Sequence, residues 1–246
     1  MTPYAILNFR PFAKAPRMSF DKPEDFYLVY GEHRTYAPAE TRRKHIRQFD
    51  AQFWRPAECR AGMSVLELGC GTGIFLAYLR RKRIAEFVGV DADEAVKKYM
   101  PDDVAARVTI GDIRDFIDKT ERVFDRIVML DVFEHFSVFE GRALLSSLKP
   151  LLAPEGRIVM RLPNAASPWG LQYQFQDLTH KAIYGPGNIR HLAHAAGYDC
   201  LACFSARRGN PFKHFIEDCV HALLNRMLTE PPPVWGANMV VVLKPK

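Results

Sequence analysis

The stretch SVLELGCGTGIF, residues 64–75, places three glycines within five positions directly after an apolar run. Such a run is typical of a buried strand, and Gly69, Gly71 and Gly73 separate it from a helical pattern. A strand, a glycine turn and a helix together leave unpaired backbone N–H groups above the carboxyl edge of a sheet, where nucleotide-like ligands bind. We therefore expect a small molecule to approach the backbone closely at this loop.

The spacing of these glycines distinguishes the loop from a dinucleotide-binding loop. The dinucleotide pattern G-x-G-x-x-G requires a third glycine where this chain has Ile74. Glu67, two residues before the first glycine, would repel a pyrophosphate but suits a ligand that carries an ammonium group. A nucleoside joined to an amino-acid end fits both features better than a dinucleotide does.

Short apolar runs continue along the chain at the spacing of strand, crossover helix and parallel strand. The runs in the middle are continuous in Val, Ile and Leu, which is typical of a sheet covered by helices on both faces. The expected strands are SVLEL (64–68), EFVGVD (86–91), RVTIGD (107–112), DRIVMLD (125–131), GRIVMRL (156–162), YDCLACFS (198–205) and ANMVVVLK (237–244). The sequence thus predicts an α/β fold with seven strands.

The remaining segments predict one domain with additions. Before the first strand, Ile46, Phe49 and Phe53 share one face of an expected helix that would lie over the open end of the sheet. The predicted divisions are a helical extension or cap at 1–60, a domain at 61–246, and insertions within that domain at 163–188 and 209–235.

The second insertion contains an amphipathic helix, residues 212–228, that a triple proline ends. Its apolar residues at helical spacing are Phe212, Phe215, Ile216, Cys219, Leu223 and Met227. We expect this face to pack on the domain or on a second subunit, and a peripheral membrane contact is the alternative. Glu217, Asp218 and Arg226 on its other face exclude a bilayer span.

The charge balance permits an anionic partner without requiring one, because the net charge is +6 and the pI is about 9.1. The basic residues are spread along the chain, and we interpret the small clusters RRK (42–44) and RR (207–208) as solvated faces. Without a basic patch interleaved with aromatic residues, we expect no nucleic-acid partner. The absence of a secretory signal and of any run of about 18 apolar residues predicts a cytoplasmic protein with no transmembrane segment.

The five cysteines are an odd number and are expected to stay reduced. Cys200 and Cys203 form one C-x-x-C, but no second pair follows at zinc spacing. If YDCLACFS is a strand, its alternate residues face opposite ways, so we expect these two thiols to be buried and structural.

Acidic residues follow three further predicted strands at the point where each strand ends. Asp91 lies 22 residues after Gly69, where a carboxylate at a strand tip can accept both ribose hydroxyls. Asp112 follows the third strand, where an adenine amino group could be held, and Asp131 follows the fourth at the mouth of the crevice. Acids at single strand ends often cap helices, but a succession of them predicts a ligand site.

The segments VLELGCGTG, GVDAD, IGDIRDF and FDRIVMLDVFEHF, in this order and spacing, resemble the motifs of class I S-adenosylmethionine-dependent methyltransferases over about residues 60–165. The resemblance implies a Rossmann-like seven-stranded mixed sheet in the order 3-2-1-4-5-7-6 with the last strand antiparallel. It implies S-adenosylmethionine as cofactor and S-adenosylhomocysteine as product. The residues it assigns to the cofactor are Glu67, Gly69 and Gly71 at the methionine part, Asp91 at the ribose, and Asp112 with Ile113 at the adenine; Asp131 completes the predicted set.

The residues after the fourth strand bear on the methyl acceptor. Nucleic-acid and protein amide-nitrogen methyltransferases resemble one another in an N-P-P-Y type turn here, whereas this chain has DVFEH, which disfavours amino methylation of a base. Asp131, Glu134 and His135 have the i, i+3, i+4 spacing of one helical face. His135 could take a hydroxyl proton, or the three could help to bind a divalent cation. The cation alternative is similar to ubiquinone-pathway O-methyltransferases in its E-H pair; otherwise Glu134 caps a helix and His135 only packs.

The first insertion supplies a second candidate base. Asp177 and His180 in DLTHK are three residues apart, which is close enough for a carboxylate to orient an imidazole. The D-x-T-H element, followed by a small helix ending in A-G-Y, resembles that of methyltransferases associated with surface glycans and other glycosylated products. A structural or substrate-orienting role for His180 is the alternative. The aromatic residues that could stack on an acceptor or seal a lid are Trp169, Tyr173, Phe175 and Tyr184.

Together these features predict an O-methyltransferase for a sugar hydroxyl in glycan or glycosylated-metabolite biosynthesis. The expected catalytic residues are His180, Asp177 and His135, without a resident metal. The alternatives are an O-methyltransferase for a small phenol or quinone, and a non-catalytic S-adenosylmethionine-binding protein. The expected partners are a small-molecule or glycan acceptor and a second copy of the chain in a homodimer.

Overall fold

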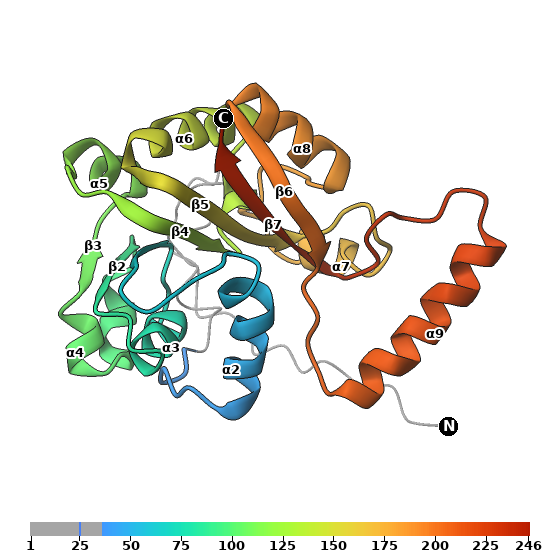
Figure 1. Ribbon diagram of the computed structural model, residues 1–246, viewed down its shortest axis with the longest axis horizontal. Helices are drawn as coiled ribbons and strands as arrows, with labels where there is room; N and C mark the ends of the chain where they lie inside the picture. The colour runs from blue at the N-terminus through green and yellow to red at the C-terminus, as the bar shows by residue number, and fades with distance from the viewer. Residues whose placement is uncertain (1–24, 26–35) are drawn as a thin grey trace.

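The chain folds around one seven-stranded sheet (Figure 1). A computed structural model describes Asp25 and residues 36–246, so the rest of the predicted extension lies outside the described residues. The strands are β1 (Ser64–Leu68), β2 (Glu86–Asp91), β3 (Val108–Ile110), β4 (Phe124–Leu130), β5 (Leu152–Pro163), β6 (Tyr198–Ser205) and β7 (Asn238–Pro245). Their order, β3-β2-β1-β4-β5-β7-β6, confirms the predicted fold class, and β7 is antiparallel to both of its neighbours.

Parallel pairing brings the ends of the central strands to one edge. Leu68 of β1 pairs with Val90 of β2 and with Met129 of β4, and Leu130 pairs with Arg161 of β5. The loops that follow these strands therefore lie together at the carboxyl edge. β5 starts earlier than predicted, because Leu152 still pairs with β4 across a register shift, and the expected APEG turn lies inside the strand.

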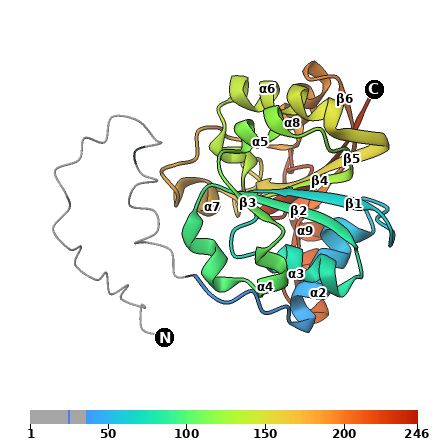
Figure 2. The same cartoon turned by 90° about the vertical axis from the view of Figure 1, so that its left-hand side faces the viewer.

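Helices cover both faces of the sheet (Figure 2). One layer contains α5 (Ile113–Lys119), α6 (Val138–Leu148) and α8 (Pro186–Ala195), and the other contains α2 (Arg43–Phe49), α3 (Ile74–Arg81) and α4 (Asp102–Ala105). Short helices at η2 (Asp50–Trp54), η3 (Glu94–Tyr99), η4 (Phe133–His135) and η5 (Lys149–Leu151) connect the elements.

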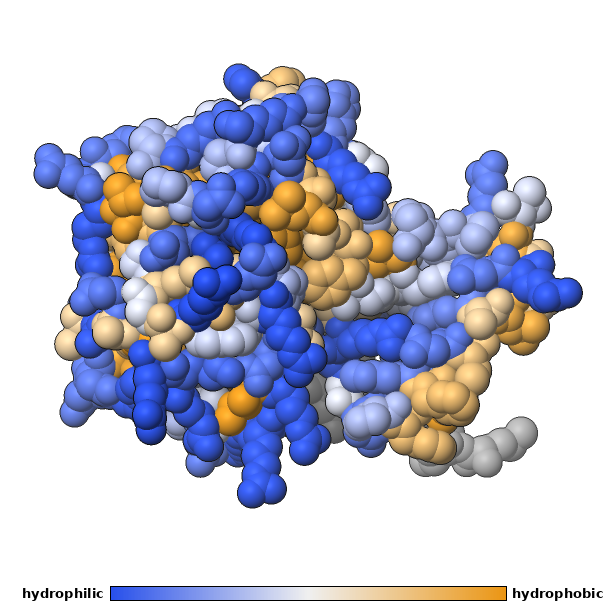
Figure 3. All heavy atoms as spheres, in the orientation of Figure 1, coloured by the Kyte–Doolittle hydropathy of each residue, from blue (hydrophilic) through white to orange (hydrophobic). Residues whose placement is uncertain are grey.

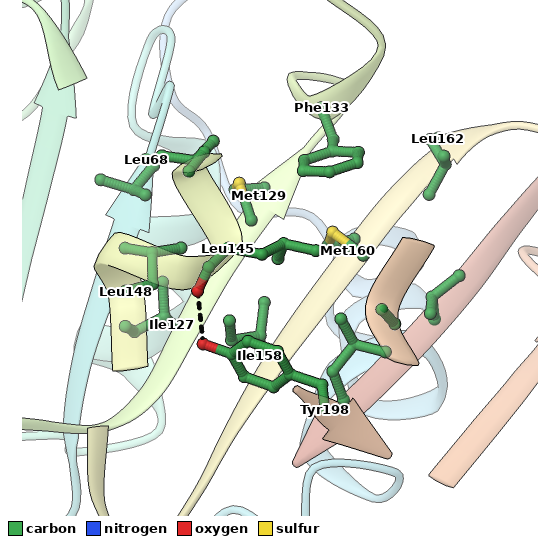
Figure 4. Close-up of a cluster of buried hydrophobic side chains, with 14 of the residues drawn as sticks. Leu68, Ile127, Met129, Phe133, Leu145, Leu148, Ile158, Met160, Leu162 and Tyr198 are labelled. Atoms are coloured by element: carbon green, nitrogen blue, oxygen red, sulfur yellow. Dashed lines mark hydrogen bonds between the residues drawn. The ribbon is translucent and has the colours of Figure 1, made fainter. Parts of the chain in front are cut away.

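The apolar strand residues divide between these two layers. In β1, Leu66 and Leu68 belong to the core beneath α6 and α8, whereas Val65 belongs to the core beneath α3. The α6 core is closed by Tyr198, whose hydroxyl donates a hydrogen bond of 2.7 Å to the backbone carbonyl of Leu145 (Figure 4). Burial on both faces explains why the strands are continuous in apolar residues instead of alternating.

The segment before β1 packs beside α3. Phe49 and Phe53 are buried against Phe75, with ring centroids 5.2 and 4.9 Å apart. The predicted helix changes to a π-helical turn at Asp50, whose carboxylate accepts a hydrogen bond of 2.7 Å from the Tyr78 hydroxyl. The helix α2 thus belongs to the layer of α3 and α4 on one face of the sheet. Its N-terminal half borders the carboxyl edge of the sheet.

Buried polar side chains attach the first insertion to the segment before β7. The amide of Asn164 donates to the carbonyl of Val234 at 2.7 Å, and the hydroxyl of Ser167 donates to the carbonyl of Trp235 at 2.6 Å. Within the insertion, α7 (Leu171–Phe175) leaves Phe175 65% exposed. Its aromatic residues therefore differ: Trp169, Tyr173 and Phe175 are exposed, whereas Tyr184 is buried against Phe133.

The second insertion forms α9 (Pro211–Met227), which projects beside the sheet (Figure 1). Its polar face turns toward the body, where Asn225 accepts a hydrogen bond from Trp235 and His221 stacks on the same indole. Its apolar face is uncovered by the described residues, and hydrophobic residues gather there on the surface (Figure 3). The expectation that the apolar face packs on the domain is therefore wrong for this part of the chain. Among the described residues, no helix is long and apolar enough to cross a membrane.

The C-x-x-C pair also differs from expectation. A register shift between Cys200 and Ala202 changes the alternation of β6, so Cys200 and Cys203 both pack against the α6 core. Both thiols are only partly buried, and burial raises the pKa of Cys203 to about 11. This favours the protonated, structural form that the sequence predicts.

A capping box starts α6 and makes its stability depend on pH. Glu140 Oε2 accepts a hydrogen bond of 2.9 Å from the Ser137 backbone N–H, and Glu140 Oε1 accepts one of 2.6 Å from Arg114. The Ser137 N–H, more than Arg114, holds the pKa of Glu140 at about 2. Because the folded pKa lies below the unfolded one, the stabilisation is present above pH 4.5 and lost as the pH falls toward 2.

We expect Glu140→Gln to lower the free energy of unfolding at neutral pH by roughly 0.5–1 kcal/mol, a value that allows for screening at this exposed site. The difference from the wild type should shrink as the pH falls below about 4.5. Urea unfolding across this range measures it, with Glu121→Gln, an exposed acid without an ion pair among the described residues, as control. A difference that does not change with pH would contradict the assignment.

Candidate active site

The glycine loop after β1 has a left-handed backbone at each of its three glycines. The φ angles of Gly69, Gly71 and Gly73 are 70°, 50° and 76°. A Cβ on Gly69 would lie 2.4 Å from a methyl group of Val132, so this position also needs glycine for space. No described atom lies within 4 Å of a Cβ built on Gly71, so the loop faces open space at this residue. This is the cradle that close backbone approach to a ligand requires.

Glu67, at the end of β1, is buried below this loop. The side chain is 2% exposed, and its Oε2 has no hydrogen-bond partner among the described residues. Burial raises the pKa of Glu67 well above its usual range, the charge of Asp91 raises it further, and Arg161 lowers it. An orphaned buried carboxyl group of this kind suits a cationic or hydrogen-bonding ligand group.

Asp91 and Asp112 occupy the tips of β2 and β3. Asp91 accepts hydrogen bonds from the backbone N–H of Gly71 at 2.7 Å and of Asp93 at 3.0 Å, which ties its carboxylate to the glycine loop. Asp112 accepts a hydrogen bond of 2.7 Å from the N–H of Arg114 and caps α5, whose first residue is Ile113. Each carboxylate retains lone pairs that hydroxyl or amino groups of a ligand can use.

A cavity of about 500 Å³ opens beside the loop. Its lining residues include Gly71 and Thr72 from the loop, Ile74 at the start of α3 and His45 from α2. The N-terminal half of α2 therefore forms one wall of the space above the glycines.

Asp131 turns away from the neighbouring acids toward Arg161. It has a left-handed backbone with φ of 59°, and its carboxylate accepts two hydrogen bonds from the Arg161 guanidinium, at 2.9 and 2.5 Å. Burial alone would lower the pKa of Arg161, but Asp131, Glu134 and Glu67 raise it. The single helical turn that would place Asp131, Glu134 and His135 on one face does not form, because the backbone is left-handed at Asp131 and the short helix η4 begins only at Phe133.

Thr179 links Asp177 to His135. The Thr179 hydroxyl lies 2.5 Å from Asp177 Oδ1 and 3.0 Å from His135 Nδ1. A carboxylate only accepts, so the hydroxyl donates to Asp177 and accepts from His135 Nδ1–H. This assigns the Nδ1-protonated tautomer to His135 when it is neutral.

His180 lies beside His135 and is held differently. Its Nδ1 lies 2.9 Å from the backbone carbonyl of Gln174, to which it must donate, so the basic lone pair is on Nε2. Nε2 faces Glu134 Oε1 at 3.9 Å and Asp177 Oδ2 at 4.0 Å, both too long for hydrogen bonds. Asp177 therefore contacts His135 through Thr179 and lies only near His180.

Comparison with known proteins shows the family and the fold of this chain. A protein-family model described as a methyltransferase domain matches residues 32–202, more than half of the chain. The chain belongs to the methyltransferase family. A solved S-adenosylmethionine-dependent methyltransferase from Archaeoglobus fulgidus shares the fold, with a TM-score of 0.63 and 20% identity over 89% of this chain and 99% of that one.

Two curated relatives cover parts of this methyltransferase. The mitochondrial ubiquinone biosynthesis O-methyltransferase of Schizosaccharomyces pombe is 29% identical over 46% of the chain and 42% of its own length. The sphingolipid C9-methyltransferase of Komagataella phaffii is 25% identical over 49% of the chain and 27% of its own length. The chain therefore spans less than half the length of either relative, and the two relatives methylate different kinds of atom.

The cofactor of the family is S-adenosylmethionine, as predicted, and the residues of this methyltransferase fit it. The left-handed loop leaves open space at Gly71, the orphaned Glu67 carboxyl can meet an ammonium group, and Asp91 presents acceptors at the tip of β2. These residues would hold the methionine part and the ribose. When bound, the cofactor supplies an electrophilic methyl group on a sulfonium centre.

Glu134 completes a group of side chains that could hold a divalent cation. One ligand atom from each of Glu134, His135 and His180 lies within 4.8 Å of the others. Glu134 is 1% exposed, its Oε2 has no partner among the described residues, and burial raises its pKa, with a further increase from Asp131. The sequence proposed Asp131 instead of His180 for such a group, but Asp131 is held by Arg161.

Three residues of this site were not predicted as site residues: Arg161, Thr179 and Gln174. Arg161 is the one charged side chain in the apolar run IVMRL (158–162), which is a recognisable signal for a paired buried charge. Thr179 follows Asp177 at the spacing of a local turn that its hydroxyl and N–H complete. Gln174 acts through its backbone carbonyl, and no sequence signal marks it.

The buried Glu67 carboxyl is expected to lower the stability of the cofactor-free protein while it increases affinity for the cofactor. Its folded pKa is raised, so the folded state holds the proton more tightly and the free energy of unfolding falls as the pH rises above about 4.5. We expect Glu67→Gln to make the cofactor-free protein more stable at about pH 7.5 but not at about pH 4, where the carboxyl is protonated in both states. Affinity for S-adenosylhomocysteine should fall at least about tenfold.

Urea unfolding without cofactor and calorimetric titration with S-adenosylhomocysteine measure the two effects of Glu67→Gln. The control is Glu94→Gln, which removes an exposed acid at the start of η3, the short helix after β2. Unchanged cofactor affinity in Glu67→Gln would remove this residue from the cofactor site.

Proposed function

We propose that this methyltransferase transfers the methyl group of S-adenosylmethionine to a hydroxyl group of a sugar-containing acceptor. The observation that carries the proposal is the pair of adjacent imidazoles, His135 and His180, whose ring centroids lie 4.7 Å apart near the tip of β4. Both have Nδ1 engaged by an acceptor, which places the basic lone pair on Nε2. A hydroxyl acceptor needs such a base, whereas a neutral amine does not.

His180 is the proposed base, and His135 is the second candidate. The Gln174 carbonyl orients His180, and its Nε2 lies about equally far from the carboxyls of Glu134 and Asp177. Positive charge that develops on His180 as it takes the proton is stabilised by the Asp177 carboxylate, 4.0 Å from Nε2. Asp177 supports His135 in the same way through Thr179.

The acceptor is proposed to enter beneath the first insertion. Trp169, Tyr173 and Phe175 are partly exposed there, and aromatic side chains stack on sugar rings through their apolar faces. The D-x-T-H element, with its resemblance to methyltransferases of glycosylated products, supports a sugar. Methyl transfer requires the acceptor oxygen, the methyl carbon and the sulfur to lie in one line, and the first insertion must hold the acceptor in that position.

We expect His180→Ala to lower kcat by about a hundredfold or more with unchanged affinity for S-adenosylhomocysteine. Thr179→Val, which keeps the shape but removes the hydroxyl, should lower kcat by less, because it removes hydrogen bonds to His135 and Asp177 but leaves His180 bound to the Gln174 carbonyl. Turnover with sugar acceptors, measured as S-adenosylhomocysteine released across a pH series, gives both values. A larger loss in Thr179→Val and His135→Ala than in His180→Ala would make His135 the base.

A small phenol or quinone acceptor is the second candidate function. It is favoured by the cluster of Glu134, His135 and His180, which can bind a divalent cation, and by the similarity to a ubiquinone-pathway O-methyltransferase. A cation there would lower the pKa of a coordinated hydroxyl and replace the need for a free base.

Chelation distinguishes the two candidates. If the sugar proposal is right, treatment with ethylenediaminetetraacetate should leave turnover within about twofold, since an imidazole base needs no cation. Loss of activity that zinc or magnesium restores, in the wild type but not in His135→Ala, would favour the metal-assisted phenol reaction. Binding of S-adenosylhomocysteine without turnover of any acceptor, and without an effect of His180→Ala, would indicate the non-catalytic alternative.

The exposed face of α9 is proposed to make a contact outside the domain. Its most exposed apolar side chains are Phe212, Phe215, Leu223 and Met227. A second copy of the chain and a membrane surface are the two partners that this face suits.

A further inference from the structure

Residues from both of the basic clusters that we interpreted as separate solvated faces line one cavity. A cavity of about 1390 Å³ lies between α2, the end of β6 and the polar face of α9. Lys44 belongs to the first cluster, and Arg207 and Arg208 form the second. Hydrophilic residues occupy the surface between the body and α9 (Figure 3). The folded chain thus concentrates charge that the sequence spreads out.

The lining of this cavity is strongly basic. Among the described residues that line it, the lysines and arginines are Lys44, Arg47, Arg161, Arg207 and Arg208, and the one acidic residue is Asp218. His45, His214 and His221 also line it. A wall with five cations and one anion creates a positive potential that attracts anions.

Ion pairs neutralise only part of this charge. Arg207 is paired with Asp218, and Arg161 is paired with Asp131. Arg208 lies 3.9 Å from the same Asp131 carboxylate, which Arg161 already holds at 2.5 Å. Lys44 and Arg47 on α2 have no ion pair with any of the described residues, so this part of the chain leaves at least these two cations without a counter-charge.

Hydrogen-bond donors accompany these charges. His214, on the first turn of α9, has a buried Nε2 without a hydrogen-bond partner among the described residues, and it lines the cavity. Asn210 caps α9 and lies in the same wall. A phosphate group has several acceptor oxygens and would satisfy both the unpaired cations and this imidazole.

The cavity adjoins the cofactor site. His45 and Ile74 line both this cavity and the one beside the glycine loop. Arg161 lines this cavity and is hydrogen-bonded to Asp131 at the tip of β4, four residues before His135. A group held by α2 and α9 could therefore belong to the same molecule whose hydroxyl reaches the methyl group.

We propose that this cavity binds a phosphate or diphosphate group of the methyl acceptor through Lys44, Arg47, Arg208 and His214. The inference rests on the proposed methyl transfer to a hydroxyl and adds the class of acceptor, a phosphorylated or diphosphate-linked sugar. The group could be free in solution, as in a nucleotide-linked sugar, or carried by a lipid. The exposed apolar face of α9, on the other side of this helix, makes a lipid-borne phosphate a source that must be tested.

The test is calorimetric titration of the full chain with inorganic pyrophosphate at low ionic strength, together with a separate titration with S-adenosylhomocysteine. The variant is Lys44→Glu with Arg47→Glu. The control is Arg43→Glu with Arg81→Glu, which makes the same charge change at exposed residues of α2 and α3 that line neither cavity.

We expect the Lys44/Arg47 variant to lose pyrophosphate affinity at least about tenfold and the control to stay within about twofold. S-adenosylhomocysteine should bind all three proteins alike. No pyrophosphate binding by the wild type, or an equal loss in the control, would overturn the inference while leaving the methyltransferase assignment intact. A wild-type protein that does not bind S-adenosylhomocysteine would instead refute the proposed function itself.

Competition identifies the source of the phosphate. Uridine diphosphate that displaces pyrophosphate supports a nucleotide-linked acceptor. Vesicles of phosphatidylcholine with phosphatidic acid are the second competitor, and vesicles of phosphatidylcholine alone are their control. Displacement of pyrophosphate by the first kind of vesicle but not by the second supports a lipid-borne acceptor. Failure of both competitors would reject the assignment of this cavity to the acceptor.

Discussion

The ion pair between Arg161 and Asp131 holds the active-site edge together. Arg161 is buried at the tip of β5, and the pKa of its guanidinium is raised by Asp131, Glu134 and Glu67, against the effect of burial. A buried charge is tolerated when it is paired and hydrogen-bonded, as Arg161 is by two bonds to Asp131. Arg161 is thus a shared cation for carboxyl groups of β1, of the residue after β4 and of η4, and it links the cofactor edge to the segment that carries the histidine pair.

The same edge contains groups that a folded protein without ligands does not need. Glu67 and Glu134 are buried, and each has an oxygen without a partner among the described residues. Burial raises the pKa of both and favours their neutral forms, which lowers the cost of burying them. Such groups reduce stability, and the expectation that they serve a ligand follows from their position beside the glycine loop and the histidines.

Much of the fold was predictable from short stretches of sequence. The bounds of β1, β2 and β6 match the predicted strands. Burial on two faces gives β1 and β2 their continuous apolar runs, whereas β6 lies at the edge of the sheet and is mostly half-buried. The glycine loop and the acids at strand tips follow directly from where those runs end. Predictions that depended on an assumed local geometry were less accurate: the shift in β6 put Cys200 and Cys203 on one core, and α9 did not bury its apolar face.

The sequence by itself determined the glycines and acids at the edge of the sheet, because these depend on spacing along the chain. The order and spacing of the motifs indicated the family, and the order of the sheet was what that resemblance implied. Only the tertiary structure decided which side chains meet across that edge. Thr179 connects Asp177 to His135, and Lys44 on α2 shares a cavity with Arg208 after β6. Such contacts join segments that are distant in sequence, and side-chain direction after a strand depends on one backbone angle, as at Asp131. Neither property leaves a periodic signal, so neither could be read from the pattern of residues alone.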